Sequence, residues 1–257
     1  MYTQEIGLTE ELAIVEEMIL LEGNAKKYHI LVPDNRAEIF IPLSEDISLK
    51  PIGGIRDISL EAGKAYFFKP RGRGVEVLLE DTNCFIAKVN SIYTKNISER
   101  LQEVCNGVYE FQIGARDVKT LLRTLYSGDI YEASDVIQNL LPDASDLFEY
   151  NMTVLDSIEK IRSTSGTISI KEIYSTLNVS KSKLEQHFNK EIGLTPKEFC
   201  KIEKINCFIN TYKEAAGLSL TELTYQCGYY DQSHLIKDFK YFLDTSPKKY
   251  FNQLGVI

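Results

Sequence analysis

The spacing of hydrophobic and polar positions changes along this chain, and the change predicts two kinds of structure. Between residues 28 and 92, short runs rich in Ile, Val, Phe and Tyr alternate with turn residues; the runs are Tyr28–Val32, Ala37–Leu43, Lys64–Lys69, Val75–Glu80 and Cys84–Ile92. Short strands at such intervals predict a β-sandwich or a small barrel. The preceding residues 1–22 fit either a short helix from Thr9 or a strand-like arm.

From Ser98 onward the apolar positions follow a helical spacing. The pattern predicts four helices: one capped by Ser98, one lined by Leu121, Leu122 and Leu125, one over Asp129–Leu140, and one that begins at Asp143. Their apolar stripes fit either a dimer contact or an internal core. The polar segment Arg162–Thr167 is the predicted linker to the rest of the chain.

The last part of the chain contains one unit twice, at an offset of 50 residues that becomes 51 after one inserted residue. Each copy opens with a Ser-x-x-Glu capping box, at Ser169 and at Ser219, and continues as helix, tight turn and helix. Two helices joined in this way describe a helix-turn-helix. One copy alone fits a plain helical hairpin equally well, but two copies with matched caps favour the helix-turn-helix.

A long helix is predicted between the two copies. Thr195, Pro196 and Glu198 supply an N-cap, a proline at the first helical position and a capping-box glutamate, and the helix should end near Ala215. A helix of about 20 residues is roughly 30 Å long, close to the turn of about 34 Å in B-DNA. The pattern therefore predicts two recognition helices held for successive major grooves.

Two segments carry a resemblance to a known family: Leu177–Phe199 and Cys227–Tyr250. They resemble the DNA-binding domain of AraC/XylS-type transcription regulators, and the likeness covers roughly residues 155–253. The family usually has arginine where this chain has Lys204, and a small alanine where it has Phe208 and Thr224. The stretches VPDNRAEIFIPL and KAYFFKPRGRG loosely resemble the cupin-like barrel of such regulators.

The resemblance implies an α+β multidomain fold. A cupin-like β sensor domain is expected over residues 1–97, a helical dimerisation and linker region over 98–164, and an all-α domain with two helix-turn-helix units joined by a linker helix over 165–257. Net charge agrees with this division. Residues from 160 onward hold 14 Lys and Arg against 10 Asp and Glu, whereas the earlier residues hold 15 against 27. The second half can therefore neutralise phosphates, and the acidic half should lie away from DNA.

The family reads bases with outward residues of the second helix of each unit. The matching positions here are Ser182, Glu185 and Gln186 in the first unit and Gln232, Ser233 and Lys237 in the second, and Lys183, Lys190 and Lys240 are expected at phosphates. Lys181 and His234 complete the predicted interface, although His234 also fits a capping or packing role. Simple solvation remains an alternative for each of these residues.

An effector site in the barrel is the other candidate. Aromatic and basic residues near its expected mouth are Tyr28, Tyr66, Phe68, Arg71 and Arg73, although core or rim positions would explain them too. The run Arg71–Gly74 fits either an anion cradle or a solvated hairpin turn. His29 is the only histidine before residue 160, so neither a metal site nor a catalytic set is predicted, and no cofactor is expected.

The sequence thus predicts an effector-responsive, sequence-specific DNA-binding transcription regulator and not an enzyme. Promoter DNA, RNA polymerase and a second copy of the chain are the expected partners. The five cysteines without a Cys-x-x-Cys pair, the lack of a long apolar run and an N-terminus unlike a signal peptide favour the cytoplasm. The alternative is a protein-interaction module whose degenerate helix-turn-helix domain is controlled by a partner.

Overall fold

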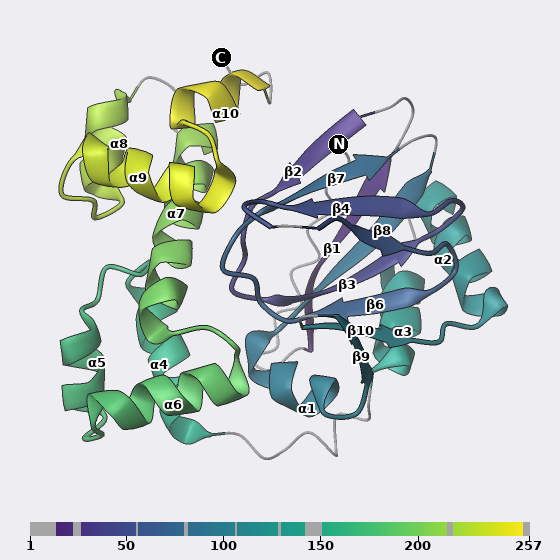
Figure 1. The fold of residues 1–257 in the computed structure, drawn as a ribbon, viewed down its shortest axis with the longest axis horizontal. Helices are drawn as coiled ribbons and strands as arrows, with labels where there is room; N and C mark the ends of the chain where they lie inside the picture. Colours follow the sequence, from purple (N-terminus) through teal and green to yellow (C-terminus); the bar gives the residue numbers. More distant parts are fainter. Residues whose placement is uncertain are drawn as a thin grey trace.

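A computed structural model shows a sheet domain and a helical domain side by side (Figure 1). It describes residues 14–22, 27–54, 56–79, 82–105, 107–127, 130–141, 151–214 and 218–253. The N-terminal part of the chain supplies the strands and the C-terminal part supplies a bundle of helices. Thr9 and Asp143, where helices were predicted to begin, lie outside the described residues.

Two antiparallel sheets form the first domain. The larger has the order β1 (Val15–Glu22), β8 (Asn83–Val89), β3 (Ala37–Pro42), β6 (Ala65–Phe68), β10 (Val108–Phe111) and β9 (Gln102–Cys105). The smaller has the order β2 (Lys27–Leu31), β7 (Val75–Leu79), β4 (Ile47–Pro51) and β5 (Ile58–Leu60). All five strands predicted from the apolar runs are confirmed, and the ambiguous arm before them contains strand β1.

Strand β3 is buried along its whole length because both of its faces are covered. Phe40 points between the two sheets, where its ring meets that of Phe68 at a centroid distance of 4.9 Å. Ile39, on the opposite face, belongs to the second apolar cluster, which also contains residues of the helices. Such two-sided burial explains why apolar residues occupy both faces of the strand, at Ile39, Phe40 and Ile41, instead of alternating with polar ones.

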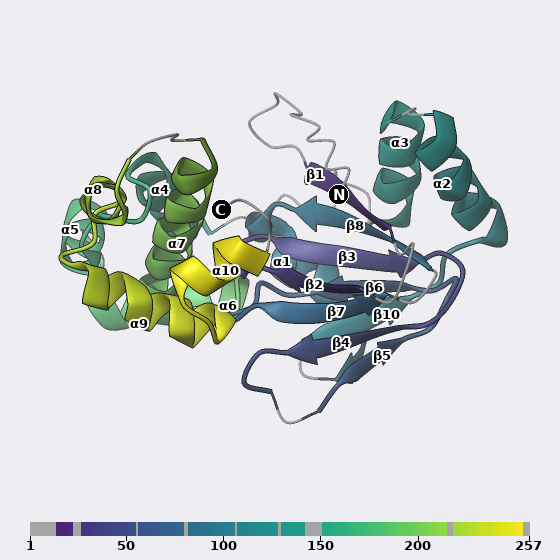
Figure 2. The same ribbon diagram turned by 90° about the horizontal axis from the view of Figure 1, so that it is seen from above.

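The helices that follow the sheet differ in part from the prediction. Ser98 does not begin a helix; it ends α1 (Thr94–Ser98), which follows the 3₁₀ turn η1 (Ser91–Tyr93). The cap lies earlier, because the side chain of Asn90 accepts a hydrogen bond from the Ile92 amide. Strands β9 and β10 come next, inside the region expected to be helical. Helices α2 (Ala115–Ser127) and α3 (Ile130–Leu140) then lie where two helices are predicted. They pack against each other on the side of the sheet away from the helical domain (Figure 2).

The helical domain begins earlier than predicted. Its members are α4 (Met152–Ser163), α5 (Ile170–Thr176), α6 (Lys181–Glu191), α7 (Pro196–Glu214), α8 (Leu220–Gln226), α9 (Gln232–Leu243) and α10 (Pro247–Gln253). Helix α4 contacts α6 and α7. The segment predicted as a linker, 162–167, therefore starts within α4 and continues through a turn at Ser165 and Gly166, which have φ angles of 48° and 73°.

Local capping signals define the helices of this domain. Ser219 and Glu222 form a complete capping box, and Thr195 and Glu198 exchange the same pair of hydrogen bonds. At Ser169 only the bond from the Glu172 amide is present. Asn178 and Gly228, the predicted left-handed positions, have φ angles of 51° and 72°. Both helix pairs therefore end and restart where the sequence predicts.

Candidate DNA interface

The first helix pair exposes the amino-terminal turn of α6. Ser180 caps this helix, because its side chain accepts a hydrogen bond of 3.2 Å from the Lys183 amide. Leu184 and Phe188 are fully buried beneath the helix, as their four-residue spacing predicts. The predicted contact residues on the outer face are exposed in four cases, Lys181, Ser182, Lys183 and Gln186, and half-buried in the case of Glu185.

The second pair repeats this arrangement with α9. The side chain of Asp231 caps the helix by accepting a bond of 2.8 Å from the His234 amide, and Leu235 and Phe239 are buried. Ser233, His234, Lys237 and Lys240 are exposed on the outer face. Gln232 is half-buried, and its Nε2 donates a hydrogen bond of 2.6 Å to Oγ1 of Thr221 on α8. The Gln232 amide is thus positioned by the preceding helix.

Helix α7 joins the two pairs as one uninterrupted helix of 19 residues. Figures 1 and 2 agree that α6 and α9 lie on the same side of α7, both with their carboxyl ends toward the sheet domain. Phe208 of α7 is fully buried and meets Phe239 of α9 at a centroid distance of 5.6 Å. The amino-terminal turns of both helices therefore point away from the sheet domain.

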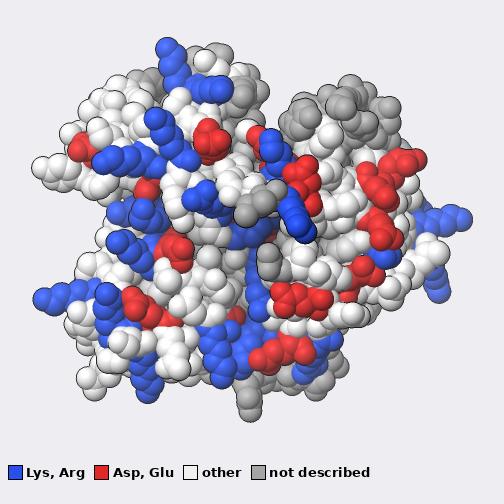
Figure 3. Space-filling model, in the orientation of Figure 1, with Lys and Arg blue, Asp and Glu red and all other residues white. Residues whose placement is uncertain are grey.

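Charge is distributed unevenly over the face that carries α6 and α9. In Figure 3, Lys and Arg are spread over the helical domain with fewer Asp and Glu among them, whereas Asp and Glu gather on the sheet domain. The exposed lysines of this face include Lys183 and Lys190 on α6 and Lys240 on α9. Such a surface can neutralise phosphates along a duplex.

The candidate effector residues do not all meet at one place. Tyr66 and Phe68 are buried in the core between the sheets, and the Tyr66 hydroxyl accepts a hydrogen bond of 3.0 Å from the Glu61 amide. Arg71 lies over the rings of Phe40 and Phe68, at 5.6 and 5.5 Å from their centroids. Arg73 instead leaves the sheet domain and covers the ring of Tyr241 on α9, at 4.5 Å. The side chain of Tyr28 lies outside the described part of β2.

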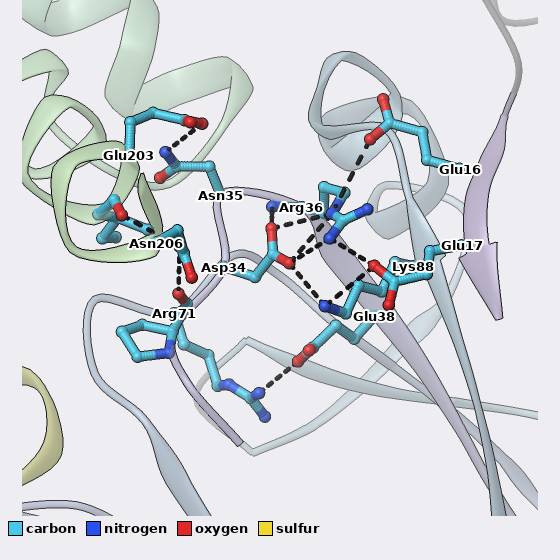
Figure 4. Close-up of polar contacts among 12 residues, drawn as sticks. Glu16, Glu17, Asp34, Asn35, Arg36, Glu38, Arg71, Lys88, Glu203 and Asn206 are labelled. Carbon is cyan, nitrogen blue, oxygen red and sulfur yellow. Dashed lines mark hydrogen bonds and ion pairs between the residues drawn. The ribbon is translucent and has the colours of Figure 1, made fainter. Parts of the chain in front are cut away.

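A layer of charged side chains closes the end of the sheet domain that faces the helices (Figure 4). Arg36 Nη2 lies 2.6 Å from Oδ2 of Asp34 and 2.6 Å from Oε2 of Glu17, and Lys88 Nζ lies 2.8 Å from the same Asp34 oxygen. Burial alone would raise the pKa of Asp34, but the charges of Lys88 and Arg36 hold it well below its usual range. Asp34 is therefore charged at neutral pH.

Arg71 and Glu38 add a further ion pair to this layer. Burial raises the pKa of Glu38 against the opposing charge of Arg71. The Arg71 Nη1 atom is buried and has no hydrogen-bond partner among the residues that the structure describes. One donor of this guanidinium is thus left over beside two aromatic rings.

Sequence reasoning missed the contacts that join the two domains. Asn35 Nδ2 donates hydrogen bonds of 2.9 Å to the Phe199 carbonyl and to Oε1 of Glu203 on α7, and Asn206 Nδ2 donates one of 3.0 Å to the Pro33 carbonyl (Figure 4). The Pro-Asp-Asn segment carries only the signal of a turn. No local pattern marks it as a docking loop for α7.

The carboxyl ends of both α6 and α9 are held by the sheet domain. Lys95 of α1 lies 3.7 Å from Glu191 at the end of α6. The Gly74 amide donates a hydrogen bond of 2.9 Å to the Phe242 carbonyl in the last turn of α9. The run Arg71–Gly74, predicted as an anion cradle or a solvated hairpin, is in fact a contact between the domains.

These features define a two-domain protein in which a β-sheet domain is followed along the chain by a pair of helix-turn-helix units. Residues 174–253 match the model of a helix-turn-helix domain family. Together with the relatives described next, this match shows that the helical domain is of the AraC/XylS type. Within the described part of the chain, no helix is both long and apolar enough to cross a membrane.

Similar proteins include two regulators of Escherichia coli. The transcriptional activator PerA of strain E2348/69 is 26% identical over 176 residues, which cover 66% of this chain and 60% of PerA. The xylose operon regulatory protein of strain K12 is 29% identical over 83 residues, which cover 32% of this chain and 21% of that protein. The matched regions thus span less than two thirds of either relative.

Solved structures of ToxT from Vibrio cholerae share the whole fold. One at 1.65 Å resolution has a TM-score of 0.58 and 12% identity, and covers 93% of this chain and 98% of its own. Another, with bound unsaturated fatty acid, has a TM-score of 0.57 and 14% identity, and covers 94% and 96%. The fold is therefore ToxT-like, with a cupin-like sheet domain followed by a helix-turn-helix domain.

Proposed function

We propose that this chain is a sequence-specific DNA-binding transcription regulator whose sheet domain adjusts the DNA-binding domain. The observation that supports this most directly is the paired exposure of α6 and α9 on one side of α7. Nineteen helical residues make α7, and a helix of that size is roughly 28 Å long. This length suits two helices that enter successive major grooves, about 34 Å apart, on one face of a duplex.

The outer faces of the two helices carry suitable chemistry for reading bases. Gln186 and Gln232 offer the paired donor and acceptor that adenine requires, Lys237 suits guanine, and Glu185 can accept a bond from cytosine. Ser182 and Ser233 supply short hydroxyls at the same exposed turns. We assign Lys183, Lys190 and Lys240 to phosphates, which position the protein without specifying sequence.

The expected partners follow from this arrangement. The first proposed partner is promoter DNA, which the protein would bind in the cytoplasm. The second is RNA polymerase, which also acts at promoters. We place a homodimer contact on α2 and α3, because these helices lie on the side of the sheet away from α6 and α9 and leave those helices uncovered (Figure 2). PerA and the xylose operon protein, both regulators by name, support a role in transcription rather than catalysis.

We also propose that the sheet domain binds an organic acid as effector. The unpartnered Nη1 of Arg71, beside the rings of Phe40 and Phe68, combines a donor for a carboxylate with an apolar wall. The ToxT structure that holds an unsaturated fatty acid supports this class of ligand. A titration with an unsaturated fatty acid should raise the melting temperature of the wild type and have a smaller effect on Arg71→Lys.

One experiment separates this function from that of a protein-interaction module. The purified chain is used to select binders from a random-sequence duplex pool, and the affinity for the selected duplex is then measured over a range of salt concentrations. A DNA-binding regulator enriches one motif. The logarithm of its affinity falls by about 0.9 for each phosphate contact when the salt concentration rises tenfold. An interaction module enriches no motif, and that result would overturn the proposal.

A further inference from the structure

Two of the five cysteines lie in contact beside the turn of the second helix pair. Sγ of Cys207, on α7, is 3.7 Å from Sγ of Cys227, which caps the carboxyl end of α8. Oγ1 of Thr211 lies 4.0 Å from the first sulfur and 3.9 Å from the second. The same hydroxyl donates a hydrogen bond of 2.8 Å to the Cys207 carbonyl. Both sulfurs are thus held together by a residue one helical turn away.

The two thiols differ in access and in acidity. Cys227 is buried, with 1% of its surface exposed, whereas Cys207 is half-buried. The hydrogen bond with Cys227 lowers the pKa of Cys207 to about 6, and the same contact raises the pKa of Cys227 far above its usual value. A thiolate attacks an oxidant and a neighbouring thiol then resolves the product. Cys207, which is partly exposed and has the lowered pKa, is suited to be the attacking thiolate. Cys227 lies close enough to be the resolving thiol.

Cys227 also lies at the start of the short turn that leads from α8 into α9. The next residue, Gly228, adopts a φ of 72°, and its carbonyl accepts a hydrogen bond of 3.2 Å from Nζ of Lys204 on α7. A Cβ on Gly228 would come within 2.3 Å of the Thr167 side chain. The turn between α8 and α9 is therefore packed closely on two sides, and it leads directly to Asp231, the cap of α9.

We propose that Cys207 and Cys227 form a reversible disulfide that alters the placement of α9 and weakens DNA binding. The effect on DNA rests on the proposed function, but the disulfide does not. Hydrogen peroxide is the oxidant class. The Cys207 thiolate attacks one peroxide oxygen, the O–O bond breaks, and the products are a sulfenic acid and hydroxide, which takes up a proton to become water. The Cys227 sulfur then attacks the Cys207 sulfur, the S–O bond breaks, and the Cys227 thiol proton passes to the departing hydroxyl, which leaves as a second water.

Closing the disulfide must change the local structure. The S–S bond is about 2.05 Å long, so the two sulfurs have to approach from their separation of 3.7 Å. Cys227 is enclosed, and therefore the end of α8 and the turn at Gly228 move toward α7. Base contacts of α9 depend on that turn, whereas α6 lies in the other unit. We expect a loss of roughly tenfold in affinity for the selected duplex, comparable to one lost base contact.

The first test detects the bond itself in the full chain. A Cys105→Ser background removes the exposed cysteine that could link two molecules. Cys84 and Cys200 remain as internal controls, because both are buried and burial raises their pKa. After treatment with hydrogen peroxide, the intact mass should fall by two hydrogen atoms, and digestion should yield one peptide that joins Cys207 to Cys227. A thiol reductant should restore the mass.

Matched variants make the outcome decisive. Cys207→Ser and Cys227→Ser should each abolish the loss of two hydrogens, and Cys227→Ala serves in place of the serine variant if the buried hydroxyl prevents folding. Oxidation of Cys207 to sulfinic acid without a cross-link would overturn the disulfide, as would a cross-link that involves Cys84 or Cys200.

The second test measures binding of the duplex that the reduced protein selects from a random pool. The oxidised background protein should bind about tenfold more weakly, and Cys207→Ser should bind equally well before and after peroxide. Equal affinity of the cross-linked and reduced forms would overturn the effect on α9. Failure to select any duplex would contradict the proposed function instead, and the mass measurement would still decide whether the disulfide forms.

Discussion

The Gly74 amide lies 2.9 Å from the carbonyl oxygen of Phe242, and this hydrogen bond ties a loop of the sheet domain to the last turn of α9. The neighbouring Arg73 guanidinium covers the ring of Tyr241, which strengthens the same contact. A carbonyl at the end of a helix has no partner within the helix. The loop therefore supplies a donor for the Phe242 carbonyl, so a hydrogen bond in the last turn of α9 depends on the sheet domain.

Gly74→Ala should separate this loop from α9. A Cβ at position 74 would lie 2.7 Å from the Leu31 carbonyl and 3.1 Å from Cδ2 of Leu243, so the loop must shift and the bond to Phe242 should break. We expect faster hydrogen exchange in the last turn of α9, and a loss of roughly 1–3 kcal/mol in the free energy of unfolding.

The matched control for that variant lies in the same loop. A Cβ on Gly72 would meet no atom closer than Cδ2 of Leu194, at 3.8 Å, which is an ordinary contact. Gly72→Ala should therefore leave exchange in α9 unchanged. Equal exchange rates in the two variants would show that the loop does not restrain α9.

Gln232→Ala should lower affinity for the selected duplex by about 1–3 kcal/mol and leave binding to random DNA nearly unchanged. The reason is that a glutamine amide reads adenine, and this one is already oriented by its bond to Thr221. Thr221→Ala, which removes only the orienting hydroxyl, should have a smaller effect. An equal loss on both kinds of DNA, measured by fluorescence anisotropy, would remove Gln232 from the base-reading set.

Lys240→Ala should weaken binding to every duplex and reduce the slope of affinity against salt by about one unit, because one phosphate contact is lost. Lys64→Ala is the control with the same change of charge, since Lys64 pairs with Glu61 and Glu110 in the sheet domain, outside α2, α3 and both helix-turn-helix units. If both variants keep the wild-type slope, Lys240 does not contact a phosphate.

Glu203→Gln should stabilise the protein near neutral pH. Burial raises the pKa of Glu203, against the opposing effects of the Asn35 hydrogen bond and the charge of Arg162. The folded state thus binds a proton more readily than the unfolded state, and the wild type gains stability as pH falls through the raised pKa. The amide removes the buried charge, so we expect a gain of about 1 kcal/mol at neutral pH.

The same comparison across pH tests the sign of this effect. The advantage of Glu203→Gln should shrink as the solution is acidified from about pH 8 to about pH 5, because the wild-type carboxyl takes up its proton. Glu214→Gln is the control, since Glu214 is an exposed residue at the end of the same helix. Urea denaturation at each pH measures both variants. A constant difference over the whole range would contradict the assignment.

Most of the helical domain could be predicted because its boundaries are set by local chemistry. Ser180, Asp231 and Thr195 each cap a helix through bonds within three residues. The left-handed positions at Asn178 and Gly228 are equally local. In the sheet domain, a strand that is buried on both faces, as β3 is, could be predicted from its run of apolar residues.

The rest depends on contacts between distant parts of the chain. All four residues of β9 are exposed, so Gln102–Cys105 has no apolar alternation to reveal a strand. The docking of Asn35 on α7 joins residues 164 positions or more apart in sequence. Within the candidate site, capping and outward positions were predictable, but the bond from Gln232 to Thr221 and the role of the Arg71–Gly74 loop required the folded chain.

Helix α7 is one continuous helix that joins α6 and α9, the two proposed base-reading helices, and Asn35 and Asn206 attach it to the sheet domain. A displacement at that joint consequently reaches the two helices together rather than one at a time. On a bound promoter, both half-sites would gain or lose their reader in a single concerted step.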